Sequence, residues 1–293
     1  MSTTALLEKQ APSSQKTDEM PLVSICIPTY NGAKTIIQTL NSVLDQTYPN
    51  LEIIVCDDIS SDNTVDVINQ MNNERITVMT NPQNLGLVKN MNHCIQVANG
   101  KYVKVLCQDD ILQNDIIEKQ VRAFTENDGV SIVTGASTVI DENDQVINKR
   151  CLYNTSRRID GKKFARKSLG GRNFYGEPCI QLYETEKAKR AGIYSDPDMF
   201  YCVDWDAGID MSYLGDVYYI ADTLASFRIS SNTSSAKMSK NKDPRIINCT
   251  KIMYEKHKSL GMLALGGVHQ MKFELMIRLY SIARNLIIRK ANG

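Results

Sequence analysis

The chain has 293 residues, of which 42% are hydrophobic and 23% charged, and its net charge is +1. This composition is typical of a globular protein with a sizeable core. No apolar run approaches the roughly 18 residues of a membrane-spanning helix, and no CxxC pair occurs among the eight cysteines. These features argue against a transmembrane protein, a disulfide framework and a zinc site.

The first segment, residues 1–20, is polar and lacks the apolar centre of a signal peptide, so it predicts a disordered arm. Several cysteines fall within predicted strands, namely Cys26, Cys56 and Cys107. That placement indicates buried, reduced thiols in a reducing compartment. We therefore expect a cytoplasmic protein, without a nucleic-acid partner.

From residue 21 the chain alternates between β-prone runs and helical patterns. The predicted elements are a strand at 22–27 that Pro28 ends, a helix at 36–44, a strand at 51–56, a helix from 64, a strand at 75–80, a helix at 87–95 and a strand at 102–106. Units of about 30 residues predict right-handed βαβ crossovers. The sequence thus predicts an α/β fold with a mostly parallel mixed sheet flanked by helices.

After Leu112 the alternation weakens. Residues 151–175 are basic and polar, and we interpret them as a mobile loop over a site, with a solvated connection as the alternative. Residues 230–235 are polar and predict a flexible loop or lid. The remaining predicted elements are a strand at 130–140, its hairpin partner at 145–148, a helix near 184–191, and two strands at 217–220 and 223–229.

The end of the chain is basic. Residues 236–293 contain 12 Lys and Arg against 3 Asp and Glu, which gives +9, whereas the preceding residues carry −8. We expect a helical extension here. Its last segment, 271–290, places Leu275, Leu279 and Ile282 on one face. This helix either makes peripheral contact with the inner face of the membrane or packs on the preceding domain or on a second subunit of a homo-oligomer.

Two predicted strands end in paired acids, Asp57-Asp58 and Asp109-Asp110. Strand ends near a switch point of a doubly wound sheet meet in one crevice. Acids there repel a nucleotide's phosphates unless a divalent cation intervenes, so we infer a Mg²⁺ or Mn²⁺ site. Acids that favour a helix N-terminus are the alternative. Because GxGxxG and GxxxxGK[ST] are both absent, the sequence disfavours a dinucleotide fold and a P-loop phosphotransferase.

A second acidic motif surrounds the single tryptophan. Asp204-Trp205-Asp206 follows the aromatic residues Phe200 and Tyr201. An Asp beside an aromatic ring suits sugar binding and activation of a hydroxyl. Core packing for Trp205 and N-capping for Asp204 are the alternatives.

Together these motifs resemble the inverting family-2 glycosyltransferases, whose GT-A fold is a nucleotide-binding α/β domain. The resemblance is strong from Pro21 to about Leu112, weaker to about Ser235, and implies a domain at 21–235 before the 236–293 extension. The motifs are the opening Val23-Ser24-Ile25-Cys26-Ile27-Pro28-Thr29-Tyr30-Asn31, the signature Asp57-Asp58-Ile59-Ser60-Ser61-Asp62, the run from Asn84-Leu85-Gly86 to Asn92, and Cys107-Gln108-Asp109-Asp110.

The resemblance implies a role for each matching residue. Asp204 would be the general base, Asp109 and Asp110 would hold Mn²⁺ or Mg²⁺, and Trp205 and Arg228 would belong to the acceptor site or lid. The implied nucleotide-binding residues are Pro28, Thr29, Tyr30, Asn31, Asp57, Asp58, Lys89 and Asp109.

Three positions depart from the family pattern. Cys107 stands where the first acid of Asp-x-Asp is usual, and a thiol suits hard Mg²⁺ poorly. Val203 replaces the Glu before the base, and Ser230 replaces a His after Arg228. Coordination of the metal would therefore rest on Asp109 and Asp110.

The resemblance implies that a sugar moves from a nucleotide-sugar, with UDP-sugars favoured, to a hydroxyl of a saccharide or lipid-linked saccharide. Such transfer would serve polysaccharide, oligosaccharide or glycolipid assembly. The three departures leave open a catalytically impaired nucleotide-sugar-binding protein. Nucleotidyl transfer needs a Gly-rich basic loop after the first strand, and residues 28–32 lack one.

Overall fold

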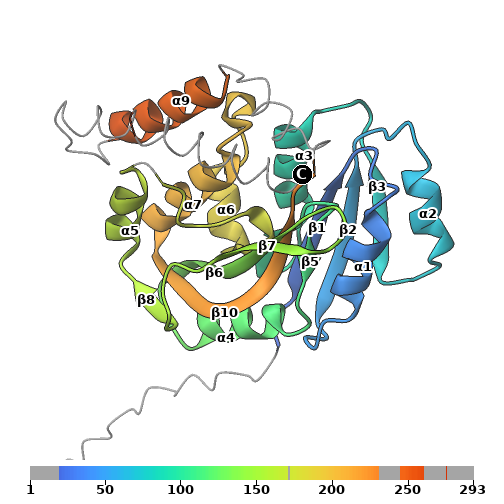
Figure 1. Ribbon diagram of the computed structural model, residues 1–293, viewed down its shortest axis with the longest axis horizontal. Helices are drawn as coiled ribbons and strands as arrows, with labels where there is room; N and C mark the ends of the chain where they lie inside the picture. Colours follow the sequence, from blue (N-terminus) through green and yellow to red (C-terminus); the bar gives the residue numbers. More distant parts are fainter. Residues whose placement is uncertain (1–19, 171, 231–244, 261–274, 276–293) are drawn as a thin grey trace, which may run out of the picture.

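The computed structural model describes residues 20–170, 172–230, 245–260 and 275. Strands and helices alternate strictly in the first part of the chain (Figure 1). The elements there are β1 (Val23–Thr29), α1 (Ile36–Leu44), β2 (Leu51–Asp57), α2 (Thr64–Gln70), β3 (Ile76–Thr80), α3 (Leu87–Val97) and β4 (Tyr102–Val105). All seven match the predicted elements within a few residues, because their apolar periodicity is strong.

The second part of the chain is less regular. Its elements are β5 (Ile111–Leu112), α4 (Ile116–Thr125), β6 (Val130–Ile140), β7 (Val146–Arg150), β8 (Arg157–Ile159), α5 (Gly161–Ser168), the 3-10 helix η1 (Pro178–Ile180), β9 (Leu182–Glu184), α6 (Thr185–Ala191), the 3-10 helix η2 (Pro197–Met199), α7 (Val203–Leu214), β10 (Asp216–Arg228) and α9 (Arg245–Ser259).

The strands form one mixed sheet, which confirms the predicted α/β class. Its order is β3-β2-β1-β4-β9-β6-β10-β5, with β7 paired to β6 and β8 to β10. The β3-β2-β1-β4 part is parallel, whereas the short β9 runs antiparallel to β4 and β6. The chain winds outward from β1 to β3 and then returns to β4 on the other side of β1. The carboxyl ends of β1 and β4 therefore flank a topological switch point.

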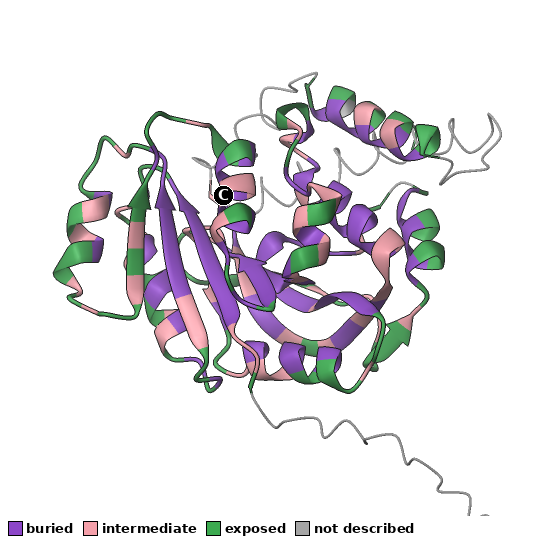
Figure 2. Ribbon diagram, turned by 180° about the vertical axis from the view of Figure 1, so that it is seen from behind, coloured by how far each residue is buried: buried purple, intermediate pink, exposed green. Residues whose placement is uncertain are grey.

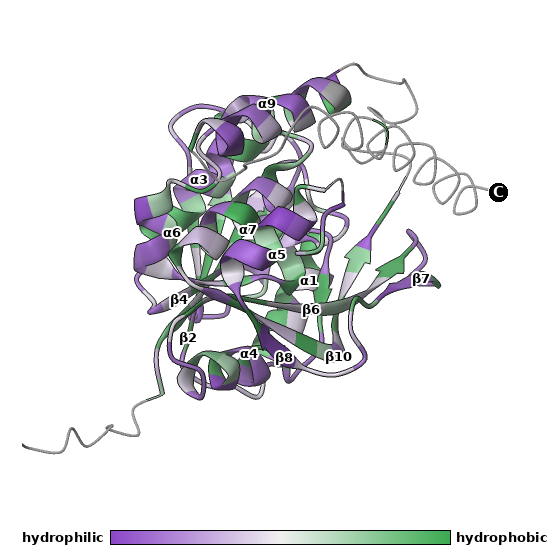
Figure 3. Cartoon of the chain, turned by 90° about the vertical axis from the view of Figure 1, so that its left-hand side faces the viewer, coloured by the Kyte–Doolittle hydropathy of each residue, from purple (hydrophilic) through white to green (hydrophobic). Residues whose placement is uncertain are grey.

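Each face of the sheet is covered by its own apolar layer. Side chains from α3, α5, α6, α7 and α9 build one buried cluster, and side chains from α1, α2 and α4 build the other. Figure 2 shows the central strands buried along most of their length and the helices exposed on their outer sides. Figure 3 shows α4 on the opposite side of the sheet from α5 and α7. Packing on both faces of the sheet thus holds in place the strand ends that lead into the paired aspartates.

Pro28 does not end the first strand, contrary to prediction. It lies inside β1 and is paired with Cys56 of β2. The even-numbered residues of β1 point their backbone toward β4, as the bond from Leu106 N–H to the Cys26 carbonyl shows. Pairing with β4 ends at Cys26. Pro28 lies beyond that point, so the pairing of the two strands does not require the N–H that proline lacks.

The 151–175 segment is not the loop that was predicted. It contains the strand β8 and the helix α5, whose N-cap Asp160 accepts a hydrogen bond from the Lys163 backbone N–H at 2.8 Å. The two predicted strands after residue 216 are a single strand, β10, with register shifts between Ile220 and Ala225. The high charge of α5 hid its amphipathic pattern.

Several sequence predictions lie outside the described residues. They are the disordered arm at 1–19, most of the 230–235 lid, and the 271–290 helix apart from Leu275. In the described part of the extension, α9 packs against η2 and α7. None of the described helices is long and apolar enough to cross a bilayer. Of the cysteines predicted to be buried in strands, Cys26 and Cys56 are buried, whereas Cys107 is only partly buried.

A buried lysine lies in β4. Lys104 is fully buried, and its ammonium donates hydrogen bonds to the carbonyls of Cys179 (2.8 Å) and Gln181 (2.9 Å). Burial lowers the pKa of Lys104 to about 7. This side chain therefore fastens η1 and β9 to the strand that leads into the acids.

We predict a pH-dependent effect of Lys104→Met on stability. Above pH 7 the folded protein has lost a proton that the unfolded chain keeps up to about pH 10.4. Raising the pH from 7 to 9 should therefore increase the unfolding free energy of the wild type, relative to the variant, by about 2 kcal/mol. Urea denaturation of both proteins at the two pH values checks this. An equal gap at both values would contradict the assignment.

Candidate functional site

The loop after β1 and the acidic motif after β4 meet at the switch point between these two strands. The side-chain amide of Gln108 accepts from the Tyr30 backbone N–H (2.9 Å) and donates to the Tyr30 carbonyl (3.1 Å). The Tyr30 side chain is 50% exposed at this rim. Thr29, at the end of β1, is buried and donates its hydroxyl to the Ile27 carbonyl at 3.1 Å. The loop after β1 and the loop after β4 thus form one unit.

A glycine makes this union sterically feasible. A Cβ on Gly32 would come within 2.3 Å of the Gln108 amide oxygen. The Gly32 backbone N–H donates to the Thr64 hydroxyl at 2.8 Å, so the same residue also fixes the loop to the start of α2. A side chain at position 32 would displace the Gln108 amide and so break its two hydrogen bonds to Tyr30.

Asn31 and Asp57 shape the neighbouring loop at 58–62. Asn31 has a positive φ of 51°, and its side-chain oxygen accepts from the backbone N–H of Ser61 at 2.7 Å. Asp57, which is buried, accepts from the Ser60 backbone N–H at 3.1 Å and from its hydroxyl at 2.5 Å. Two of the predicted nucleotide-binding residues therefore belong to one hydrogen-bonded loop cluster.

Asp58 holds the loop before α3. One carboxylate oxygen accepts from the Leu85 backbone N–H (2.7 Å), and the other accepts from Gly86 (2.8 Å). The Asn81 amide adds a third bond at 2.8 Å. Lys89 is exposed in the first turn of α3 that this loop begins. Asp58 is thus committed to the protein itself, and Asp57 is the acid with fewer bonds.

Asp109 and Asp110 differ in their surroundings. Asp109 is partly exposed, and burial raises its pKa to about 6, although the charge of Arg228 acts in the opposite direction. Asp110 is fully buried and accepts from the Arg228 backbone N–H at 3.0 Å. Its burial and the charge of Asp109 raise the pKa of Asp110 well above its usual range. A nearby cation would stabilise the ionised forms of both carboxyls, whose pKa values are raised.

The donor set fits a divalent metal ion. The second oxygen of Asp110 is buried without a hydrogen-bond partner among the described residues. Within that same part of the chain, no group of three or more His, Cys, Asp or Glu forms a complete metal cage. Mg²⁺ is usually held by one or two carboxylates together with substrate phosphates, so a full protein cage is not required.

Cys107 contributes to the core and not to the proposed metal site. Its side chain packs against the apolar cluster between the sheet and α7. Burial raises the pKa of the Cys107 thiol well above its usual range, and three carboxylates add to the effect: those of Asp110, Asp109 and Asp204. The acids after β4 and the acid in the first turn of α7 thus act on the same thiol.

Asp204 lies in the first turn of α7 and is half-buried. Its carboxylate accepts from the Asn173 amide at 3.1 Å. The Gln181 amide donates to the Asp204 backbone carbonyl at 3.3 Å and to the Gly176 carbonyl at 2.8 Å. Since Lys104 binds the Gln181 carbonyl, Asp204 is connected to β4 through two residues. Asn173 thus holds the carboxylate of Asp204, and Gln181 holds its backbone.

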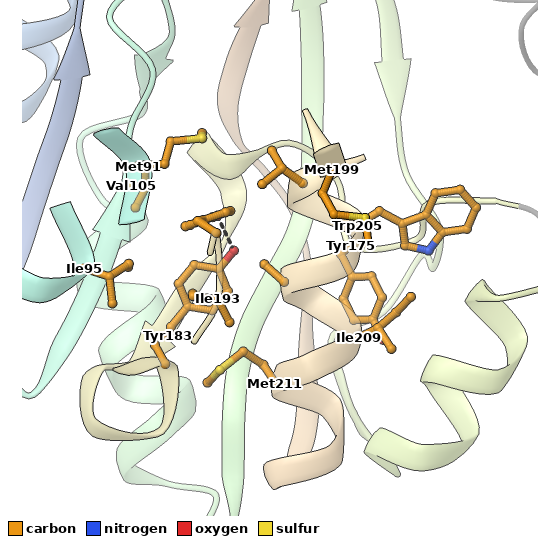
Figure 4. Packing of buried hydrophobic residues seen from close by; sticks show 14 of the residues in the cluster. Met91, Ile95, Val105, Tyr175, Tyr183, Ile193, Met199, Trp205, Ile209 and Met211 are labelled. Atoms are coloured by element: carbon orange, nitrogen blue, oxygen red, sulfur yellow. Dashed lines mark hydrogen bonds between the residues drawn. The ribbon is translucent and has the colours of Figure 1, made fainter. Parts of the chain in front are cut away.

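Trp205 lies apart from the other predicted site residues. Its ring N–H donates to the Ser168 hydroxyl of α5 at 2.6 Å, and its side chain is only 6% exposed. Figure 4 shows it within the buried cluster, with Tyr175, Met199 and Ile209. This geometry favours core packing over contact with an acceptor.

Arg228 connects the acidic motif to neighbouring elements of the fold. Its guanidinium donates to the carbonyls of Asp109 (2.9 Å) and Asp141 (3.0 Å) and to the side chain of Gln38 (2.8 Å), and it pairs with Asp144 at 2.6 Å. It is 5% exposed. The geometry favours a positioning role, which joins the acids to α1 and to the β6–β7 turn.

The extension is bound to α7 through two buried carboxylates of that helix. Lys256 of α9 pairs with Asp206 at 2.7 Å and with Asp210 at 2.6 Å, and the buried His257 ring lies 2.8 Å from Asp206. Burial and the charge of Asp206 raise the pKa of Asp210 to about 6. Because Asp204 begins the same helix, α9 helps to hold the helix that carries it.

Three residues that organise the site are hard to identify from sequence patterns. They are Gln108, Asn173 and Gln181, which contact the site through hydrogen bonds to Tyr30 and Asp204. Gln108 stands next to the acids, and that adjacency is its only signal. The other two lie in irregular chain, where no periodic pattern exists.

The model of "Glycosyl transferase family 2" matches residues 24–191, which is more than half of the chain. Over 125 residues the chain is 37% identical to an Escherichia coli protein named UDP-Glc:alpha-D-GlcNAc-diphosphoundecaprenol beta-1,3-glucosyltransferase WfgD, covering 43% of this chain and 49% of the relative. Over 118 residues it is 38% identical to the hyaluronan synthase of Pasteurella multocida, covering 40% of this chain and 12% of the relative. Both matches thus cover less than two thirds of the relative.

Solved structures share the fold. The Staphylococcus aureus TarS structure with UDP-GlcNAc has a TM-score of 0.58 at 17% identity, covering 86% of this chain and 78% of that one. The mannosyltransferase PcManGT from Pyrobaculum calidifontis, with GDP-Man and Mn²⁺, has a TM-score of 0.58 at 15% identity, covering 94% and 74%. At these identities the likeness concerns the fold alone. With the family match and the mixed sheet, it leads to one conclusion: the chain belongs to glycosyl transferase family 2 and has the GT-A fold.

Proposed function

We propose that the chain transfers a sugar from a nucleotide-sugar, and from a UDP-sugar in the first place, to a hydroxyl of a saccharide or lipid-linked saccharide acceptor. One observation carries the proposal: the carboxylates of Asp109 and Asp110, which follow β4, and of Asp204, in the first turn of α7, all raise the pKa of the same thiol, Cys107, so both acidic motifs lie within electrostatic reach of one residue. Support comes from relatives named for a UDP-Glc-dependent transferase and a hyaluronan synthase, and from a neighbour solved with UDP-GlcNAc.

The nucleotide would lie across the switch point. Tyr30 offers an exposed ring beside the loop that Asn31 and Asp57 organise, and such a ring can stack on a base. Lys89 would reach the phosphates from the first turn of α3. A divalent cation held by Asp109 and Asp110 would stabilise the charge that develops on the leaving nucleoside diphosphate.

In this mechanism Asp204 acts as the general base. Its carboxylate takes the proton of the acceptor hydroxyl while that oxygen bonds to the anomeric carbon. The bond between the anomeric carbon and the diphosphate breaks in the same step, and its electron pair stays with the phosphate oxygen. Attack opposite to the leaving group inverts the anomeric configuration once. The amide of Asn173 keeps the carboxylate oriented throughout.

A donor panel tests the proposal. We would incubate the full chain with Mn²⁺ and UDP-glucose, UDP-N-acetylglucosamine, UDP-glucuronic acid or GDP-mannose, and measure release of the nucleoside diphosphate. We expect slow hydrolysis of at least one UDP-sugar, which EDTA should stop. Binding without hydrolysis of any donor would instead indicate a nucleotide-sugar-binding protein, and absence of binding would contradict the proposal.

A further inference from the structure

A cavity of about 340 Å³ lies next to Asn173, the residue that binds the Asp204 carboxylate. It is formed by β6, β7, β10 and the 172–177 loop, and none of its lining residues comes from β1, β2 or β4. Asn173 lines the cavity and also donates to the Asp204 carboxylate at 3.1 Å. Asn173 therefore links this cavity to the proposed base.

The walls of the cavity are positively charged. Its charged lining residues are Lys149, Arg150, Arg172 and Glu177, which give a net charge of +2. Arg150 forms an ion pair with Glu177, whose side chain is buried. The excess charge therefore belongs to Lys149 and Arg172, both of which have exposed side chains.

Aromatic rings hold cations at the rim of the cavity. The Phe174 ring lies 5.8 Å from the Arg172 guanidinium and 5.1 Å from the Lys167 ammonium. The Tyr153 ring, close by, lies 4.7 Å from the Arg157 guanidinium and 5.4 Å from Lys167. Cations placed over rings are held without neutralising their charge. The rim therefore keeps its positive potential and also offers apolar faces.

We propose that this cavity is the acceptor subsite, and that it takes a sugar which carries an anionic group, a phosphate or a carboxylate, held by Lys149 and Arg172. The inference rests on the function proposed above. The volume suits one sugar ring with a charged substituent. Paired cations on a partly enclosed wall bind such an anion by charge-assisted hydrogen bonds. The acceptor hydroxyl would then lie beside Asn173, close to the Asp204 carboxylate that Asn173 binds.

The test measures binding of three probes to the full chain with UDP and Mn²⁺ saturating the donor site. The probes are N-acetylglucosamine 1-phosphate, methyl glucuronide and the neutral methyl glucoside. We expect at least one anionic probe to bind about tenfold more tightly than the neutral one. A preference for the phosphate would identify a phosphorylated acceptor, and a preference for the glucuronide would identify an acidic sugar.

A double substitution, Lys149→Gln with Arg172→Gln, should remove the preference for the anionic probe. The matched control is Lys162→Gln with Lys163→Gln, which removes the same charge from exposed positions of α5 outside the cavity and should keep the preference. The single variants serve if the double variant does not fold. Equal binding of neutral and anionic probes, or equal loss in the control, would overturn the subsite. Failure of the wild type to bind UDP with Mn²⁺ would instead contradict the proposed function.

Discussion

Asp204→Asn should slow sugar transfer by about 10²- to 10⁴-fold, the usual contribution of a general base. The amide has nearly the shape of the carboxylate and can still accept the hydrogen bond from Asn173. It cannot take a proton from the acceptor hydroxyl. Affinity for UDP with Mn²⁺ should stay close to the wild-type value, because the residues proposed to bind the nucleotide and the metal belong to other segments.

The measurement pairs turnover with nucleotide binding in the same preparation. Asp198→Asn is the matched control. It makes the same chemical change at an exposed acid in η2, just before α7. The control should transfer sugar at the wild-type rate. Turnover of the Asp204 variant at that rate would show that another group takes the proton.

Asp109→Asn should remove most of the gain in UDP affinity that Mn²⁺ provides. Asp109 is the partly exposed member of the acidic pair, and the fully buried Asp110 already accepts the Arg228 backbone N–H. Loss of one of two anionic ligands weakens a hard cation strongly, so we expect about a tenfold smaller Mn²⁺-dependent gain. Calorimetric titration of UDP with and without Mn²⁺ gives this quantity.

The control for this variant is again the Asp198→Asn protein, in which the gain should be unchanged. UDP affinity in EDTA should be at least as high in the Asp109 variant as in the wild type, since removal of a carboxylate also removes repulsion of the phosphates. An equal Mn²⁺-dependent gain in both proteins would contradict the role of Asp109 as a metal ligand.

The sequence predicted the first half of the fold well for a physical reason. The strands β1, β2 and β4 are buried along most of their length, and the helices α1 and α3 each have one apolar face, so periodicity alone identifies them. Later strands such as β8 and β9 have three residues each, and their antiparallel pairing depends on partners far along the chain. No local pattern specifies such short strands.

The site was predicted where strand ends carry paired acids, and it was incomplete where distant residues meet. Gln108 binds Tyr30 across 78 positions, and the Arg228 guanidinium binds the Asp109 carbonyl across 119. Arg228 was predicted for the acceptor site or lid, and its buried contacts favour a brace instead. Cys107 is the most puzzling departure from the family pattern. Its side chain packs against the core, and the carboxylates of the motif are those of Asp109 and Asp110.

The most direct test of the account is the anomeric configuration of the sugar at the moment of its release. With a UDP-α-sugar that the donor panel shows to be hydrolysed, proton NMR recorded before mutarotation should detect the β-anomer first. That result is predicted by one displacement with Asp204 as base and no covalent intermediate. Release of the α-anomer first would require two displacements or a front-side reaction, and it would contradict the mechanism.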